Sequence, residues 1–92
     1  MVWIVTYSRQ AEKQRAKLPE RVKRILDALI LEITANGPVR GDWKNYSMLS
    51  GGNHHCHLKK GHPTYVAVWQ VTEKTIKLVE VTYVGTHEKA PY

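Results

Sequence analysis

The pattern of apolar and polar positions predicts one strand and two helices in the first part of the chain. Val2 to Tyr7 is a β-branched and aromatic run, typical of a buried strand. Ser8 is suited to cap a helix over Arg9 to Lys17, and Leu18-Pro19 separates it from a second helix. Asn36-Gly37-Pro38 ends that helix. Its complete apolar stripe consists of Val22, Ile25, Leu26, Leu29, Ile30 and Ile33.

The rest of the chain is typical of short strands joined by tight turns. Turn residues occur at Gly51-Gly52-Asn53, at Gly61 with Pro63, and at Thr72-Glu73-Lys74. The predicted strands cover residues 46–50, 54–59, 64–71 and 75–84. This order predicts a single α+β domain over residues 1–92, in which two helices cover one face of an antiparallel meander.

Alternation along residues 54–60 predicts which side chains face the helices. Cys56 and Leu58 point one way, whereas His55, His57 and Lys59 point the other way. The apolar side should meet the helices, with Cys56 as a small buried hydrophobic residue. We therefore expect the two histidines and the lysine on an open face of the sheet.

Composition places the chain among globular domains of reducing compartments. Hydrophobic residues make up 42% and charged residues 24% of the chain. No apolar stretch is long enough for a membrane span, and the first residues do not resemble a signal peptide. The single cysteine, Cys56, has no partner for an internal disulfide. We expect a cytoplasmic protein.

An excess of positive charge indicates the kind of partner. Fourteen Lys and Arg residues against eight Asp and Glu residues give a formal net charge of +6. Many of the positive residues lie in the predicted helices, so part of the excess is a solvated helix face. The remainder favours either a phosphate backbone or an acidic protein that covers the same surface.

Histidines are concentrated near the end of the chain and indicate proton chemistry. An unperturbed histidine has a pKa of about 6.5, so it exchanges protons at neutral pH. Histidines that lie beside Lys59 and Lys60 in a basic protein favour acid and base catalysis on a polyanion such as RNA. We expect no metal ion or other cofactor, because alternation turns His54 and Cys56 away from His55 and His57, too few ligands for a zinc site. The five histidines are His54, His55, His57, His62 and His87.

The order of elements, with Lys17-Leu18-Pro19 between the helices and Gly85-Thr86-His87 near the end, resembles the RelE/ParE toxin superfamily. The resemblance covers essentially the whole chain, and Gly-Thr-His at this place is similar to RelE, HigB and YafQ-like ribonuclease toxins. It implies a RelE-like fold and a bacterial type II toxin that cleaves mRNA on the ribosome. It also implies a cognate antitoxin protein that holds the toxin inactive.

The resemblance also implies roles for individual residues. His87 matches the C-terminal catalytic histidine of that branch, and His57 matches the histidine on the middle strand. The sequence departs from the family in having no arginine after Arg40, and in having Tyr83 where a basic residue often occurs. Lysines are the nearest substitutes: Lys59, Lys60, Lys77 and Lys89.

From the chemistry of RNA cleavage, we expect His57 and His87 as the base and acid, with Lys59 or Lys60 holding the charge on the phosphate. Further RNA contacts are expected from His55 and His62. Tyr83 and Tyr92 are candidates to stack on a base, although Tyr83 is equally suited to pack as a strand aromatic.

Two other functions fit the same residues. One is a ParE-like toxin that acts on DNA gyrase without cutting RNA, and the other is a non-catalytic RNA-binding domain in which the histidines are surface polar residues. The histidine-rich open face argues against the first, because binding alone does not require titratable groups there.

Overall fold

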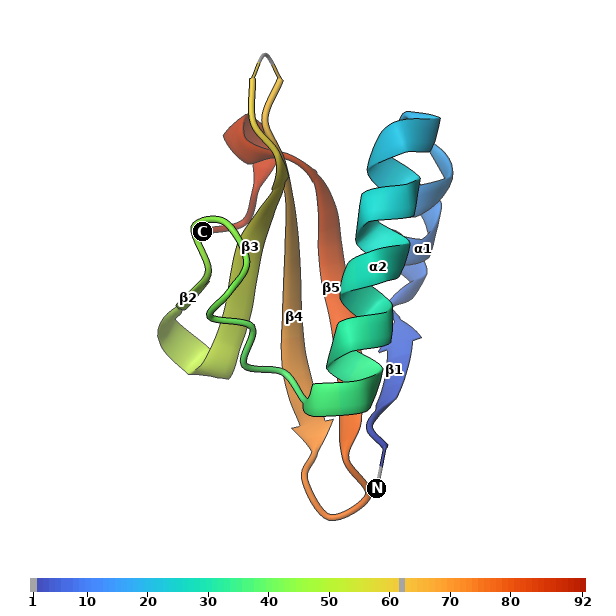
Figure 1. Ribbon diagram of the computed structural model, residues 1–92, viewed down its shortest axis with the longest axis vertical. Helices are drawn as coiled ribbons and strands as arrows, with labels where there is room; N and C mark the ends of the chain where they lie inside the picture. Colours follow the sequence, from blue (N-terminus) through green and yellow to red (C-terminus); the bar gives the residue numbers. More distant parts are fainter. Residues whose placement is uncertain (1, 62) are drawn as a thin grey trace.

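Two helices lie on one face of a five-stranded mixed sheet (Figure 1). The structure is a computed structural model that describes residues 2–61 and 63–92. The elements follow the predicted order of strand, helix, helix and strands. They are β1 (Ile4–Tyr7), α1 (Arg9–Ala16), α2 (Glu20–Asn36), β2 (Ser47–Met48), β3 (Asn53–Lys59), β4 (Tyr65–Glu73) and β5 (Leu78–Thr86), with 3-10 helices η1 (Ser50–Gly52) and η2 (His87–Lys89).

Both helices begin where the sequence predicts. The Ser8 Oγ accepts a hydrogen bond of 3.1 Å from the Ala11 N–H, which caps α1. α2 follows Pro19 and ends at Gly37, whose φ of 101° is in a region that favours glycine. A side chain there would also crowd the Trp3 indole, since an added Cβ would lie 3.1 Å from Trp3 Nε1. In the described part of the chain, neither helix is long and apolar enough to cross a membrane.

The sheet has the strand order β1-β5-β4-β3-β2. The last four strands form the predicted antiparallel meander, and β1 joins its end in parallel with β5. The strand predicted over residues 46–50 is shorter than expected, because Ser50–Gly52 turn into a 3-10 helix with Gly51 and Gly52 at positive φ. The β4–β5 turn also extends further than expected, to Lys77, whose φ is 54°.

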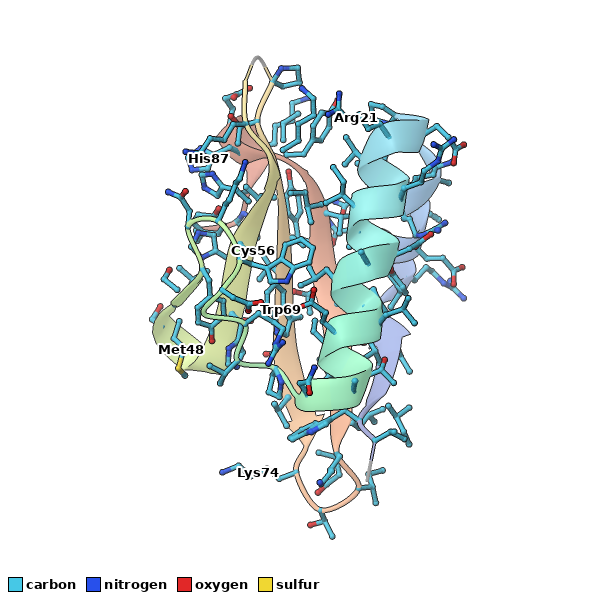
Figure 2. The ribbon with its side chains drawn as sticks, viewed as in Figure 1. Arg21, Met48, Cys56, Trp69, Lys74 and His87 are labelled. Atoms are coloured by element: carbon cyan, nitrogen blue, oxygen red, sulfur yellow. The ribbon has the colours of Figure 1, made fainter. Side chains whose placement is uncertain are left out.

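The main core lies between the helices and one face of the sheet. The stripe on α2 is confirmed, since Val22, Leu26, Leu29 and Ile33 are fully buried and Ile25 and Ile30 flank them. Cys56, Leu58 and Trp69 meet this stripe from the sheet, as predicted for the first two. Figure 2 shows Cys56 and Trp69 between the sheet and α2. The Trp69 Nε1–H donates to the Pro38 carbonyl at 2.9 Å, which fixes the chain just after α2.

The strand pairing is interrupted at three places, of which one skips Thr72 in β4 and the other two lie near the histidines. In β3 the pairing passes from His57 to Lys59, which leaves Leu58 as an extra residue. In β5 it passes from Val81 to Tyr83, which leaves Thr82 as an extra residue. Residues directly opposite one another in an antiparallel pair share a face, so each bulge changes which later residues face the helices.

A smaller apolar cluster lies on the face of the sheet away from the helices. Val66, Val68 and Tyr83 form it, and Ala90 from the C-terminal segment packs against them. The C-terminal residues therefore return across this open face, beside β3 and β4. This arrangement leaves part of the open face covered, with His57 half-buried and His87 exposed beside it.

Truncation of the central side chain on α2 should weaken the fold. Leu26 is 0% exposed, so Leu26→Ala leaves a cavity and should lower the free energy of unfolding by about 2–5 kcal/mol. Leu31→Ala is the matched control on the same helix, because Leu31 is 71% exposed and its truncation should change stability by less than about 0.5 kcal/mol. Urea denaturation followed by circular dichroism measures both, and equal losses would contradict the proposed core.

Candidate active site

Three histidines come together on the open face of the sheet. His55 and His57 are on β3, and His87 begins η2 directly after β5. The His87 N–H donates to the Thr64 carbonyl at 2.8 Å, which holds η2 against the start of β4. Ring centroids are 5.4 Å apart for His57 and His87, and 6.0 Å apart for His55 and His57. Figure 2 shows His87 on the side of the sheet away from α2.

The predicted alternation of β3 is confirmed at its histidines, but His55 is less accessible than expected. Tyr92 covers it, with ring centroids 4.8 Å apart, and only 8% of His55 is exposed. The Nδ1 of His55 lies 3.0 Å from the Ser47 Oγ on β2. This hydrogen bond fixes the ring orientation, and the Ser47 contribution was not foreseen from the sequence because it depends on the β2–β3 register.

His54 faces the helices and takes no part in this cluster. Its ring stacks on Trp69 with centroids 5.9 Å apart, and its Nδ1 shares a hydrogen bond of 2.7 Å with the Tyr46 Oη. Burial lowers the pKa of His54 below its ordinary value. His54 is therefore a neutral residue of the core that holds the Tyr46 segment against β3.

The environment of His57 favours its neutral form. Partial burial is the main reason that the pKa of His57 is lowered, and the nearby charges of His87, His55 and Lys60 lower it further. A proton on His87 therefore disfavours one on His57. His57 is therefore suited to accept a proton at neutral pH.

The two neighbouring lysines differ in their relation to the histidines, and only Lys59 departs from the expected face. Lys59 does not line up with His55 and His57, because the bulge at Leu58 pairs it with Tyr65, whose ring packs on the helix side. Lys60, not Lys59, contributes to the lowered pKa of His57. Of these two lysines, Lys60 is the one whose charge acts on His57.

The more distant lysines are divided between the two ends of the sheet. Lys77 lies in the β4–β5 turn, with its Nζ 5.5 Å from the centre of the Trp3 ring, so it is remote from the histidines. Lys89 is in η2 with His87 and lines a cavity of about 520 Å³ between α1 and β5. Of these two, only Lys89 is close along the chain to the cluster.

Tyr83 packs as a strand aromatic, which is the second of the two roles considered for it from the sequence. It is 7% exposed, and its hydroxyl donates to the Thr86 carbonyl at 2.8 Å. Gly85 permits this path of the side chain, because an added Cβ would lie 2.7 Å from the Tyr83 Oη. The expectation that Tyr83 stacks on a base is wrong for this buried ring. Tyr92, by contrast, is 48% exposed and lies 6.0 Å from His87 between ring centroids.

His62 lies outside the described residues, so its predicted RNA contact stays a prediction. Within residues 2–61 and 63–92, no group of three or more His, Cys, Asp or Glu side chains is arranged to hold a metal ion. Cys56 is buried, and burial raises the pKa of its thiol to about 12, so it is not a reactive thiolate.

Comparison with solved structures places this fold among bacterial and archaeal toxins. A mutant of the E. coli toxin RelE in the free state matches with a TM-score of 0.74 and 24% identity, over 98% of this chain and 88% of that one. The YoeB dimer from Staphylococcus aureus matches with a TM-score of 0.72 and 15% identity, over 95% and 99%. No family model and no curated protein matches the sequence.

A toxin bound to its antitoxin is also among the similar structures. The intact E. coli RelBE toxin-antitoxin complex matches with a TM-score of 0.68 and 22% identity, over 95% of this chain and 99% of that one. The agreement extends over the whole domain. The chain therefore has the fold of RelE-like toxins.

Removal of neighbouring charges should raise the pKa of His57. Both His87→Gln and Lys60→Gln remove a group that disfavours its protonated form, so its NMR titration midpoint should move upward while burial keeps it below 6.5. Lys74→Gln is the matched control, because Lys74 lies at the opposite end of the sheet (Figure 2) and should leave the midpoint unchanged. If neither His87→Gln nor Lys60→Gln changes the titration midpoint of His57, the cluster does not form in solution.

Proposed function

We propose that the chain is the toxin of a bacterial type II toxin-antitoxin system, acting in the cytoplasm as a metal-independent endoribonuclease on mRNA. The observation that carries the proposal is the pair of His57 and His87, 5.4 Å apart between ring centroids on the open face of a RelE-like fold. The formal charge of +6 supports a polyanionic substrate. The similar structures are themselves toxins.

The two histidines divide the proton transfers of RNA cleavage between them. His57, with its lowered pKa, is neutral at pH 7 and takes the proton from the 2'-hydroxyl. The 2'-oxygen then bonds to phosphorus, and the bond from phosphorus to the 5'-oxygen breaks. His87 gives its proton to that 5'-oxygen. The products carry a 2',3'-cyclic phosphate and a 5'-hydroxyl.

The remaining residues of the site bind and orient the RNA. Lys60 holds the negative charge that develops on the phosphate, and its charge already acts on His57. Tyr92 offers an exposed ring beside His87 on which a base can stack, a contact worth about 1–3 kcal/mol. His55 is a positioning residue, because Ser47 and Tyr92 hold its ring and leave little of it exposed.

Two macromolecular partners follow from the proposal. The substrate is mRNA on the ribosome, where an accessible single strand reaches the open face. The inhibitor is a cognate antitoxin protein, since the similar structures include the RelBE complex of E. coli and the RelE-RelB complex of Pyrococcus horikoshii. Its expected chemistry is that of an acidic or amphipathic segment, which complements the positive toxin surface.

Substitution of His87 is the experiment that tests the proposal. His87→Gln should keep the fold and lower mRNA cleavage at least about a hundredfold, the lower end of the contribution of acid and base catalysis. Cleavage is measured by mapping mRNA ends in a ribosome-containing extract. Glu88→Gln, at the next position of η2, is the matched control and should stay within a few-fold of the parent.

Retained cleavage in His87→Gln would remove His87 from the chemistry. His57→Gln then decides whether histidines act at all, because loss of the base should be as damaging as loss of the acid. Circular dichroism and antitoxin binding, unchanged in both variants, exclude unfolding as the cause of any loss.

A further inference from the structure

A second feature of the open face lies beside the histidines and has no part in the proton transfers. It is a cavity of about 230 Å³ between η1, the strands β4 and β5, and the C-terminal residues. Its apolar lining is Leu49, Val68 and Pro91, and its polar lining is Ser50, Asn53 and Thr82. Tyr92 completes one wall. Pockets for drug-sized molecules are larger, about 300–1,000 Å³, so this one suits a single small flat group.

The bulge in β5 aims Thr82 into this cavity. Because Thr82 is the extra residue opposite Val68, it lies on the open face together with Tyr83, although strict alternation would place these neighbours on opposite faces. The Thr82 Oγ1 donates only a long hydrogen bond of 3.4 Å to the Val68 carbonyl, so its lone pairs are available to a ligand. Bulges often re-aim a side chain next to a functional site.

Asn53 supplies a second polar group at the rim. Its Nδ2 donates to the Ser50 carbonyl at 3.2 Å, which fixes the side chain at the end of η1. The amide still offers its oxygen and one further N–H. An amide that presents a donor beside an acceptor matches the edge of a nucleobase, as asparagine does with adenine.

Tyr92 connects the cavity to the candidate active site. The same ring that forms a wall of the cavity lies 4.8 Å from the His55 ring and 6.0 Å from the His87 ring, between centroids. Val68 in the cavity also pairs directly with His55 across the sheet. A group held in the cavity therefore lies next to the histidines, separated from them by the Tyr92 ring.

We propose that this cavity binds one unstacked base of the RNA, next to the bond that is cut, and makes cleavage depend on that base. The base lies on Val68 and against Tyr92, and its edge is read by Asn53 and Thr82. This inference rests on the proposed ribonuclease function, and it adds a specificity site. Single-stranded RNA is commonly recognised in this way, through splayed bases that stack on aromatic rings and hydrogen-bond by their edges.

Cleavage of a set of mRNAs that differ in one nucleotide beside the cut, measured in the same ribosome-containing extract, tests the inference. The parent should prefer one base by about tenfold or more, since one good edge contact discriminates by about 1–3 kcal/mol. Asn53→Ala and Thr82→Val should each reduce that preference at least about threefold. Thr72→Val is the matched control, because Thr72 is also skipped in the strand pairing but lies in the exposed far part of β4, so the preference should not change.

The outcomes separate this inference from the proposed function. Cleavage without a base preference, or a preference that survives both cavity variants, overturns the base site and leaves the ribonuclease in place. Titration with AMP, GMP, CMP and UMP, followed by NMR, gives a readout that does not need activity. Shifts of the Asn53 side-chain signals that disappear in Thr82→Val support the base site even if no cleavage is found, and no shift with any of the four nucleotides overturns it.

Discussion

The pairing of β3 and β5 with β4 determines which side chains are available for chemistry. One face of the sheet is sealed by α1 and α2, so a residue is either part of the core or part of the open face. The bulge at Leu58 separates Lys59 from the histidines, and the bulge at Thr82 keeps Val84 in the core after Val79 and Val81. Without the bulge at Thr82, strict alternation after Val79 and Val81 would turn Val84 away from the helices.

The open face brings the candidate active site and the adjoining cavity together within one small area. Partial burial, with nearby charges, lowers the pKa of His57, while His87 is held at the end of β5 by a backbone hydrogen bond to Thr64. The C-terminal segment crosses the same face, packs Ala90 on the small apolar cluster and places Tyr92 over His55. The last residues of the chain are therefore structural neighbours of the site and also form a wall of the adjoining cavity.

Periodicity was sufficient to predict the elements and the side of β3 that carries His55 and His57. The apolar stripe from Val22 to Ile33 is buried only when that side of the helix packs on the sheet. Burial of Cys56 on the same side then turns His55 and His57 to the opposite face of the sheet. The bulges were not predictable, because the pairing partner decides which residue is skipped. The error at Lys59 follows from that non-local dependence, as does the unforeseen hydrogen bond between Ser47 and His55. Tyr83 is buried for another reason, because Val66, Val68 and Ala90 pack around it.

Two histidines acting without a metal ion would cleave RNA by attack of its own 2'-hydroxyl. Chemical analysis of the new mRNA ends produced in the ribosome-containing extract is the sharpest test of this proposal. We expect 2',3'-cyclic phosphate and 5'-hydroxyl ends. Ends with a 5'-phosphate would overturn the proposal, because they require attack by an activated water and not the proton transfers assigned to His57 and His87.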